Sequence, residues 1–192
     1  MRWGAALGAA LLLAACGAGD PADTVLPGVA WVSFHGEFRS VSGTNETRGR
    51  FYRHRDGSTR RETLEAGGTP AFITIEHRSA ARFYSFSGGV WTSQPLERPA
   101  RVTLPPTGAD FPSAVPQPGR IAGYRVVRAD TALGTVMLRA SALNYFALVE
   151  EHPYPALRVE FVSVVEGPVD GALFAPPRGT AVGELPWPYT GR

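Results

Sequence analysis

Short runs of alternating apolar and polar residues, separated by turn residues, fill the first half of the chain after Trp31. In residues 71–77, "AFITIEH", Ile73 and Ile75 share one side of an extended chain, and Phe72 lies on the other side. Runs of this kind with turn signals every ~8–12 residues are typical of antiparallel sheets. The pattern therefore predicts a mainly β fold with little helix.

Residues 47–62, "TRGRFYRHRDGSTRRE", hold six arginines around the dipeptide Asp56-Gly57. An Asp-Gly pair between two alternating runs is the strongest short-range signal for a β-hairpin with a two-residue turn. This turn would place Tyr52 opposite Arg61, on a face that is polar throughout. We therefore expect that face to be the solvated outside of the sheet, with a cation–π pair between the two side chains.

The other face of this hairpin would carry Phe51 toward the core and place Arg53 directly opposite Arg60. Two like charges in that arrangement are unfavourable, so a compensating group is expected. One alternative is an internal ion pair between Arg60 and Glu62, two residues away on the same face. The other alternative is that Arg53 and Arg60 lie at the rim of a hollow and bind an anionic headgroup.

Residues 95–120 hold seven prolines and separate the first strands from the later ones. Proline lacks a backbone donor and fixes φ, so neither a helix nor a central strand is expected here. The segment is predicted to be a long loop. It would be either a cover over one end of the sheet or a rigid crossover packed along it.

The pattern after this loop is less uniform. Residues 135–151, "TVMLRASALNYFALVEE", fit either a helical apolar stripe or two strands with a bend at Ser141-Ala142. The strand-like neighbouring segments favour two strands. Residues 156–167 alternate clearly and predict a further strand. Its core-facing side chains would be Val159, Phe161 and Val165.

The sequence begins "MRWGAALGAALLLAAC", in which one positive charge at Arg2 precedes an apolar run over residues 5–15. That is the pattern of a secretory signal, and the run is too short to span a bilayer as a stable helix. Its end, "LAAC", resembles the lipobox of bacterial lipoproteins. The resemblance implies that Cys16, the only cysteine of the sequence, is lipidated and becomes the first residue of the mature chain. The alternative is an ordinary signal peptide with a chance cysteine.

Lipoprotein maturation, as this resemblance implies it, attaches at least two acyl chains, and two or more chains hold a protein lastingly on a membrane. The expected location is therefore the cell envelope, with Cys16 as the lipid anchor. Gly17 at the next position favours the periplasmic face of the outer membrane if the organism has two membranes. The formal net charge of +2 for the sequence argues against nucleic acid as a partner, whereas a protein partner in the envelope stays open.

The chain is expected to have four parts. Residues 1–15 form the signal peptide, and residues 16–28 form a lipidated flexible tether of small, polar, Pro- and Gly-containing sequence. Residues 29–180 form a single β-rich domain that includes the proline-rich loop at 95–120. Residues 181–192 form a C-terminal tail, either an extension docked on the sheet or a docking peptide for a partner.

The segment "GPVDGALFAPPRG", residues 167–179, carries the pattern Pro-x-Asp-x-x-Leu-Phe-x-x-Pro-x-Gly. It resembles the closing segment of the outer-membrane lipoprotein carrier and localisation-factor families, and in outline the resemblance extends over residues 30–178. It implies a curved antiparallel sheet that forms an unclosed barrel, here called a half-barrel, around an apolar interior. Those families also have a long amphipathic helix over the mouth, and the proline-rich loop stands in its place here.

No side-chain pattern predicts catalysis, a cofactor or a metal site. The histidines lack the spacing of metal ligands, and no G-x-S-x-G nucleophile elbow is present. The neighbours Glu76 and His77 would point to opposite faces of a strand, as would Glu151 and His152, so neither pair would act together. We therefore expect no enzyme activity and no cofactor. The histidines are His35, His54, His77 and His152.

Three functions compete. The favoured function is a binding module for an apolar or amphipathic, lipid-like ligand in a connected cavity of the half-barrel. The second is a structural or interaction lipoprotein with a filled core and no ligand. The third is an enzyme, which predicts polar side chains that converge in a cleft. For the favoured function, the expected ligand-binding residues are Phe51, Arg53, Arg60, Ile73, Ile75 and Trp91.

Overall fold

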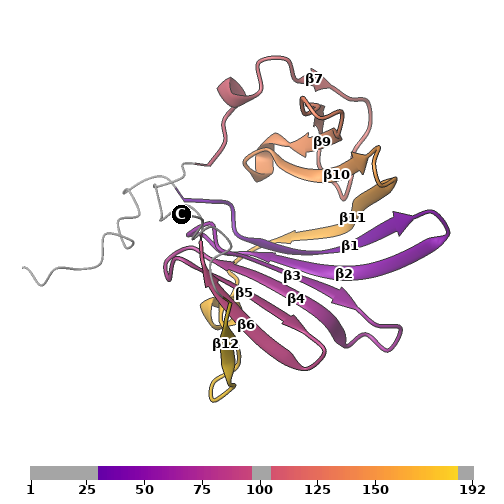
Figure 1. Ribbon diagram of the computed structural model, residues 1–192. Coiled ribbons are helices and arrows are strands. Elements are labelled where there is room, and N and C mark those ends of the chain that lie inside the picture. The colour runs from indigo at the N-terminus through magenta and orange to yellow at the C-terminus, as the bar shows by residue number, and fades with distance from the viewer. Residues whose placement is uncertain (1–29, 97–104, 186–192) are drawn as a thin grey trace, which may run out of the picture.

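The strands predicted from the alternating pattern form one large sheet in the computed structural model, which describes residues 30–96 and 105–185 (Figure 1). Its strand order is β12-β6-β5-β4-β3-β2-β1-β11-β10-β9-β8-β7, so β12 and β7 are free edges and the sheet is not closed. The strands are β1 (Phe34–Ser42), β2 (Asn45–Arg53), β3 (Thr59–Leu64), β4 (Pro70–His77), β5 (Arg82–Ser87), β6 (Val90–Pro95), β7 (Val115–Pro116), β8 (Val127–Arg128), β9 (Val136–Ala140), β10 (Phe146–His152), β11 (Leu157–Glu166) and β12 (Val182–Glu184).

Three short 3₁₀ helices are the helical elements of the described residues: η2 (Gly108–Asp110), η3 (Ser141–Leu143) and η4 (Gly171–Phe174). The prediction of a mainly β, curved and unclosed antiparallel sheet is confirmed, with β12 and β6 as the one parallel pair among the described strands. β11 pairs with β1 on one side and β10 on the other, and the sheet bends there so that β9 and β10 lie over β1 in Figure 1. None of the described helices has the length and apolar character needed to cross a membrane.

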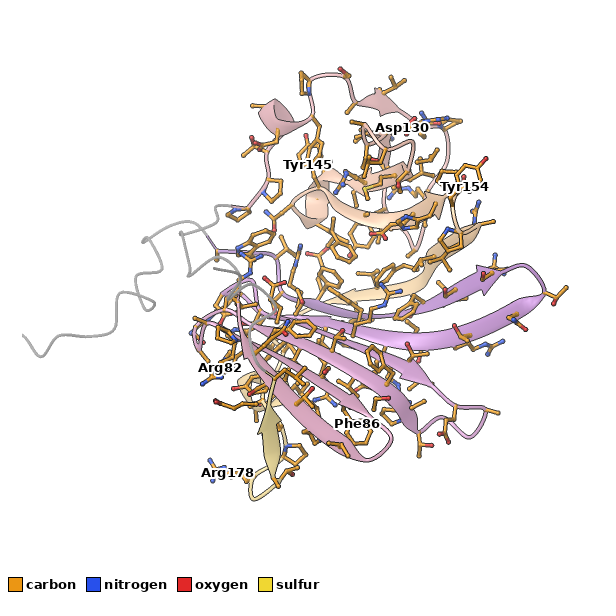
Figure 2. All side chains as sticks on the ribbon, in the orientation of Figure 1. Arg82, Phe86, Asp130, Tyr145, Tyr154 and Arg178 are labelled. Atoms are coloured by element: carbon orange, nitrogen blue, oxygen red, sulfur yellow. The ribbon has the colours of Figure 1, made fainter. Side chains whose placement is uncertain are left out.

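The sheet buries opposite faces at its two ends. The face that carries Phe34 and Phe51, here called the phenylalanine face, packs against the segment that folds over β1 and β2. The face that carries Ile73 and Ile75, here called the isoleucine face, packs against η4 under β4–β6. The first core contains Phe34, Phe38, Val126, Ala140, Leu143, Leu148, Val159 and Phe161, and the second contains Ile73, Ile75, Trp91, Val169 and Phe174. Figure 2 shows Tyr145, near the first core, and Phe86, beside the second, at opposite ends of the molecule.

The hairpin between β2 and β3 exists as predicted, but its loop is one residue longer than expected. The His54 amide donates to the Ser58 carbonyl at 2.9 Å, and the Gly57 amide donates to the His54 carbonyl at 3.0 Å. Gly57 has φ of 86°, which glycine adopts without strain. These features define a three-residue loop, a type I turn followed by a left-handed glycine, in place of the expected two-residue turn.

The longer loop changes which side chains share a face. Arg53 pairs with Thr59, and Arg60 pairs with Tyr52, so the expected pairing of Arg53 with Arg60 is wrong. The two arginines lie on opposite faces, because a one-residue slip in register moves every side chain of a strand across the sheet. The expected Tyr52–Arg61 pair is wrong for the same reason.

The internal ion pair expected for this hairpin is formed. The Arg60 guanidinium lies 2.7 Å from a carboxylate oxygen of Glu62 and donates to the Leu173 carbonyl at 2.9 Å. Both partners lie on the isoleucine face next to η4. Arg60 therefore ties the hairpin to the C-terminal segment.

The described part of the proline-rich segment, residues 105–120, is mostly loop but also holds η2 and β7. β7 is the last strand of the sheet, a position where the missing amide of Pro116 costs no ladder hydrogen bond. Residues 97–104 lie outside the described residues. The proposed role of the segment as a cover stays a prediction.

Residues 135–151 form two strands, as predicted, and η3 occupies the predicted bend at Ser141-Ala142. The expectation that Val165 shares a face with Phe161 is wrong, because β11 is bulged: Glu37 pairs with Ser163, and Phe38 pairs with Phe161. The extra residue reverses the alternation. Val164 consequently packs on the first core, and Val165 is 52 % exposed.

The structure describes only part of the expected terminal segments. The first residues of the expected C-terminal tail form β12, whose residue Val182 pairs with Trp91 of β6. The expected signal peptide at 1–15, the expected tether at 16–28 with the predicted anchor Cys16, and residues 186–192 lie outside the described residues.

Gly49 provides a test of the packing on the phenylalanine face. A Cβ atom at this position would overlap the Phe38 ring and the Glu62 carbonyl oxygen. Gly49→Ala is therefore expected to lower the free energy of unfolding by about 1–3 kcal/mol, the usual cost of overpacking. Gly67→Ala is the control, because a Cβ there meets no atom within 4 Å. Urea unfolding of both variants measures the difference, and equal midpoints would contradict the packing described.

Candidate ligand-binding pocket

A cavity of about 90 Å³ opens on the phenylalanine face, between β1–β3 on one side and β10 and β11 on the other. The alternation of the five strands brings its lining together from segments as far apart in the sequence as Phe38 and Phe161. The cavity is here called the phenylalanine pocket. Its lining residues are Phe38, Phe51, Arg61, Phe146, Ala147, Glu150, Val159 and Phe161.

Four phenylalanine rings form most of the apolar wall. The Phe51 and Phe146 centroids are 4.9 Å apart, and the Phe146 and Phe161 rings meet edge to face at 5.2 Å. Phe38 lies 5.8 Å from Phe161. Aromatic rings in contact at these distances and angles hold one another in place. The pocket is thus formed before any ligand enters.

Arg61 is the cationic group of the pocket. Its guanidinium lies 4.5 Å from the centroid of the Phe38 ring, and the residue is half-buried. Burial lowers the pKa of Arg61, while the carboxylate of Glu150 acts in the opposite direction. Among the described residues, the Arg61 guanidinium donates no hydrogen bond to a protein acceptor. No carboxylate oxygen of these residues lies within 4.0 Å of it. Glu150 itself lies 3.5 Å from the His152 ring.

A row of hydroxyl groups continues from Arg61 along the same face. Thr74 of β4 is the cross-strand neighbour of Arg61, and Ser85 and Thr92 follow on β5 and β6. The Ser85 and Thr92 hydroxyls are 2.7 Å apart, and all three residues are half-buried. The phenylalanine face is therefore apolar over β1, β2, β10 and β11 and hydroxyl-rich over β4–β6.

The structure does not bring the predicted site residues into one cavity. Phe51 lines the phenylalanine pocket, whereas Ile73, Ile75 and Trp91 pack on the isoleucine face against Phe174. The expected connected cavity is wrong, because the sheet switches the face that it buries between β2 and β4. Ligand binding by these residues stays a prediction.

Arg53 does not lie at a rim. It is 2 % exposed, its Nε donates to the Val32 carbonyl at 2.9 Å, and its Nη2 donates to the Leu143 carbonyl at 2.8 Å. Its guanidinium lies 4.7 Å from the Phe34 ring centroid and 5.3 Å from that of Phe146. Burial, with a smaller contribution from the nearby Arg78, lowers the pKa of Arg53 to about 10. Arg53 thus links the segment before β1 to η3 by hydrogen bonds, and is here called the clamp between them.

Arg60 is also engaged inside the protein, on the isoleucine face, by Glu62 and the Leu173 carbonyl. The hairpin arginine that does reach the pocket is Arg61, which the sequence reasoning assigned to the solvated side. If the loop of the hairpin is taken as three residues with a left-handed Gly57, the register places Arg61 opposite Phe51 and so on the side of the pocket. Asp56 Oδ1 accepts the Ser58 amide at 2.7 Å and stabilises that loop.

A second, wider groove of about 770 Å³ lies near β7 and β8. Its walls include the exposed Arg120 and Arg125 together with Pro116 and Gln117. Arg120 donates to the Gly123 carbonyl at 2.6 Å. Across the described ranges, no group of three or more His, Cys, Asp or Glu residues could hold a metal ion. The smaller phenylalanine pocket is the better candidate site, because its lining is mainly apolar and includes only a few charged side chains.

Comparison with known proteins identifies the fold but no family. No protein-family model matches the chain, and no curated protein sequence matches it. An uncharacterized conserved protein from Thermus thermophilus has a similar structure, with a TM-score of 0.53, 10% identity, and coverage of 80% of this chain and 91% of that one. That likeness shows the fold alone.

Two more distant structures have TM-scores below 0.5. One is the Pseudomonas aeruginosa MucA/MucB complex, with a TM-score of 0.44, 16% identity, and coverage of 75% of this chain and 56% of that one. The other is the LolA superfamily protein NE2245 from Nitrosomonas europaea, with a TM-score of 0.36, 9% identity, and coverage of 78% and 91%.

Proposed function

We propose that the protein is a lipoprotein of the cell envelope, anchored through Cys16, whose half-barrel body binds an apolar or amphipathic ligand in the phenylalanine pocket. The observation that carries the binding function is the pocket itself, an apolar cavity lined by four preorganised phenylalanine rings. Burial of apolar surface in such a site is favourable by roughly 25 cal/mol per Å². Because the rings already contact one another, binding requires little ordering of the walls.

The size of the pocket limits what enters it. A cavity of about 90 Å³ is smaller than the cavity of about 150 Å³ that accepts benzene in another protein. The pocket therefore admits a short or branched apolar end and not a whole lipid chain. The remainder of an amphipathic ligand would extend along the phenylalanine face toward the hydroxyl row.

The proposed anchor and location rest on the sequence. The "LAAC" end of the apolar run supports lipidation of Cys16, and Gly17 supports the periplasmic face of an outer membrane. The expected tether, residues 16–28, would link the anchor to the body, and a flexible chain of that length has a root-mean-square reach of about 20 Å. The body would therefore stay close to the membrane surface.

Ala147 gives a direct test of the binding function, because its side chain is buried and lines the pocket. In the chain from Gly17 to Arg192, which keeps every described residue, Ala147→Leu should fill the cavity and weaken binding of 1-hexanol at least tenfold. Nuclear magnetic resonance titration of backbone amides measures the affinity. Mass spectrometry of solvent extracts from the purified wild-type chain identifies any ligand that it carries from the cell.

The matched control is Ala156→Leu, at an exposed turn position. Circular dichroism and urea unfolding check that both variants remain folded. Equal hexanol affinities in the two folded variants would contradict the assignment of the pocket. No hexanol binding and no extracted ligand in the wild type would favour the alternative function, an interaction lipoprotein with a filled core.

A further inference from the structure

We propose that Arg61 is the specificity-determining residue of the phenylalanine pocket, and that the ligand is a short amphipathic acid whose carboxylate or phosphate binds the Arg61 guanidinium. This inference rests on the proposed function and names the chemical class of its ligand. The apolar end of the acid would enter between the phenylalanine rings, within a few bonds of the acid group.

The first support is the unused hydrogen-bonding capacity of Arg61. A guanidinium has five N–H donors and no acceptor. Arg61 is half-buried against the Phe38 ring, yet no acceptor among the described residues contacts it. Among the described residues, no Arg61 nitrogen is a buried atom without a partner, so the guanidinium is open to water and can exchange that water for a ligand. An anionic group with two oxygens would satisfy it through parallel hydrogen bonds.

The second support is the position of Arg61 at the boundary between two surfaces. Its neighbour on β2 is Phe51, in the apolar wall, and its neighbour on β4 is Thr74, the first hydroxyl of the row. A ligand that is apolar at one end and charged at the other matches this order, from the apolar wall to Arg61 and then to the hydroxyl row. Polar groups beyond the acid would meet the hydroxyls of Ser85 and Thr92.

The third support comes from the other arginines of the hairpin, which are not available. Arg53 is held by two carbonyl groups inside the first core, and Arg60 is held by Glu62 on the isoleucine face. Arg48 and Arg50 alternate with Phe51 along β2 and so lie on the isoleucine face. Arg55 is exposed in the loop at the hairpin tip and does not line the pocket. Arg61 is therefore the hairpin arginine that can meet a ligand in the pocket.

Glu150 is the second charged residue of the pocket lining, and its negative charge would oppose a bound anion. It lies 3.5 Å from His152 and is not within 4.0 Å of Arg61. This arrangement predicts that Glu150→Gln strengthens binding of an acid, while Arg61→Gln weakens it. Opposite effects from two residues of one pocket would be difficult to produce by a general loss of structure.

The experiment compares hexanoate, hexyl phosphate and 1-hexanol, which share one apolar chain, with the chain from Gly17 to Arg192 at pH 8. The wild type should bind at least one of the two acids ten times more tightly than the alcohol. Arg61→Gln should weaken binding of that acid about tenfold or more, and at least five times more than it weakens binding of the alcohol. Arg48→Gln is the control, because that side chain is 82% exposed on the other face. The better of the two acids distinguishes a carboxylate ligand from a phosphate ligand.

The outcomes separate this inference from the proposed function. If the wild type binds all three compounds equally, or if Arg61→Gln weakens acid and alcohol alike, the pocket binds apolar groups but Arg61 does not select an acid, and the inference is overturned. If the wild type binds none of them, the proposed function fails as well. Unchanged acid affinity in a folded Arg61→Gln variant also overturns the inference.

Discussion

Replacing Arg53 with methionine is expected to lower the free energy of unfolding by about 3–5 kcal/mol. Methionine keeps an apolar stem in the first core but donates no hydrogen bond. The carbonyls of Val32 and Leu143 would then lose the donors that now lie 2.9 and 2.8 Å away. Each buried acceptor left without a partner costs roughly 1–3 kcal/mol, and the contact of the guanidinium with the Phe34 ring is lost as well.

Such a loss is a large part of the total stability of a domain of this size, roughly 5–15 kcal/mol. Urea unfolding followed by circular dichroism measures it. Arg48→Met is the matched control, since this arginine of the same strand is 82% exposed and should change stability by less than about 0.5 kcal/mol. A cost below about 1 kcal/mol for Arg53→Met would show that the guanidinium is not the clamp between Val32 and η3.

Replacing Cys16 with serine is expected to abolish acylation of the mature chain. A serine cannot form the thioether through which a lipoprotein carries its diacylglyceryl group. Two or more acyl chains attach a protein lastingly to a membrane, whereas a chain without acyl groups has no such anchor. The loss of membrane attachment should therefore be nearly complete. Metabolic labelling with palmitate and the mass of the N-terminal peptide measure it directly.

Gly17→Ser is the matched control for this change, because it leaves the "LAAC" segment intact and should still be labelled. Partition into a detergent phase is a second readout for the processed chains. Equal palmitate labelling of wild type and the Cys16→Ser variant would refute the anchor at Cys16. The body of the protein, residues 30–185, contains no cysteine that could replace it.

The strands of this protein could be predicted because their signals are local. The alternation of Phe72 and Ile73 fixes two sides of β4, and Gly88-Gly89 marks the turn between β5 and β6. The two strands around Ser141 could be predicted in the same way, although a helix was a competing interpretation. Period-two patterning and turn residues act over a few residues, so one sequence suffices to read them.

The candidate site could be predicted only in part, because it depends on register. Asp56-Gly57 fits both a two-residue turn and the three-residue loop that the structure has. The difference of one residue places Arg61 rather than Arg53 or Arg60 beside the pocket. The bulge in β11 acts similarly, since it exposes Val165. Neither choice is visible in a short window, because each is decided by the pairing of distant strands.

By itself, the sequence determined the mainly β class and its hairpins, since backbone alternation and turn chemistry belong to neighbouring residues. Only the tertiary structure decided which face of the sheet is buried at each end. Phe51 is covered because β10 and β11 bring Phe146 and Phe161 onto it, and Ile75 is covered because η4 brings Phe174 to the opposite face. An apolar side chain is buried by whatever packs against it, and here the packing segments lie about one hundred residues further along the chain.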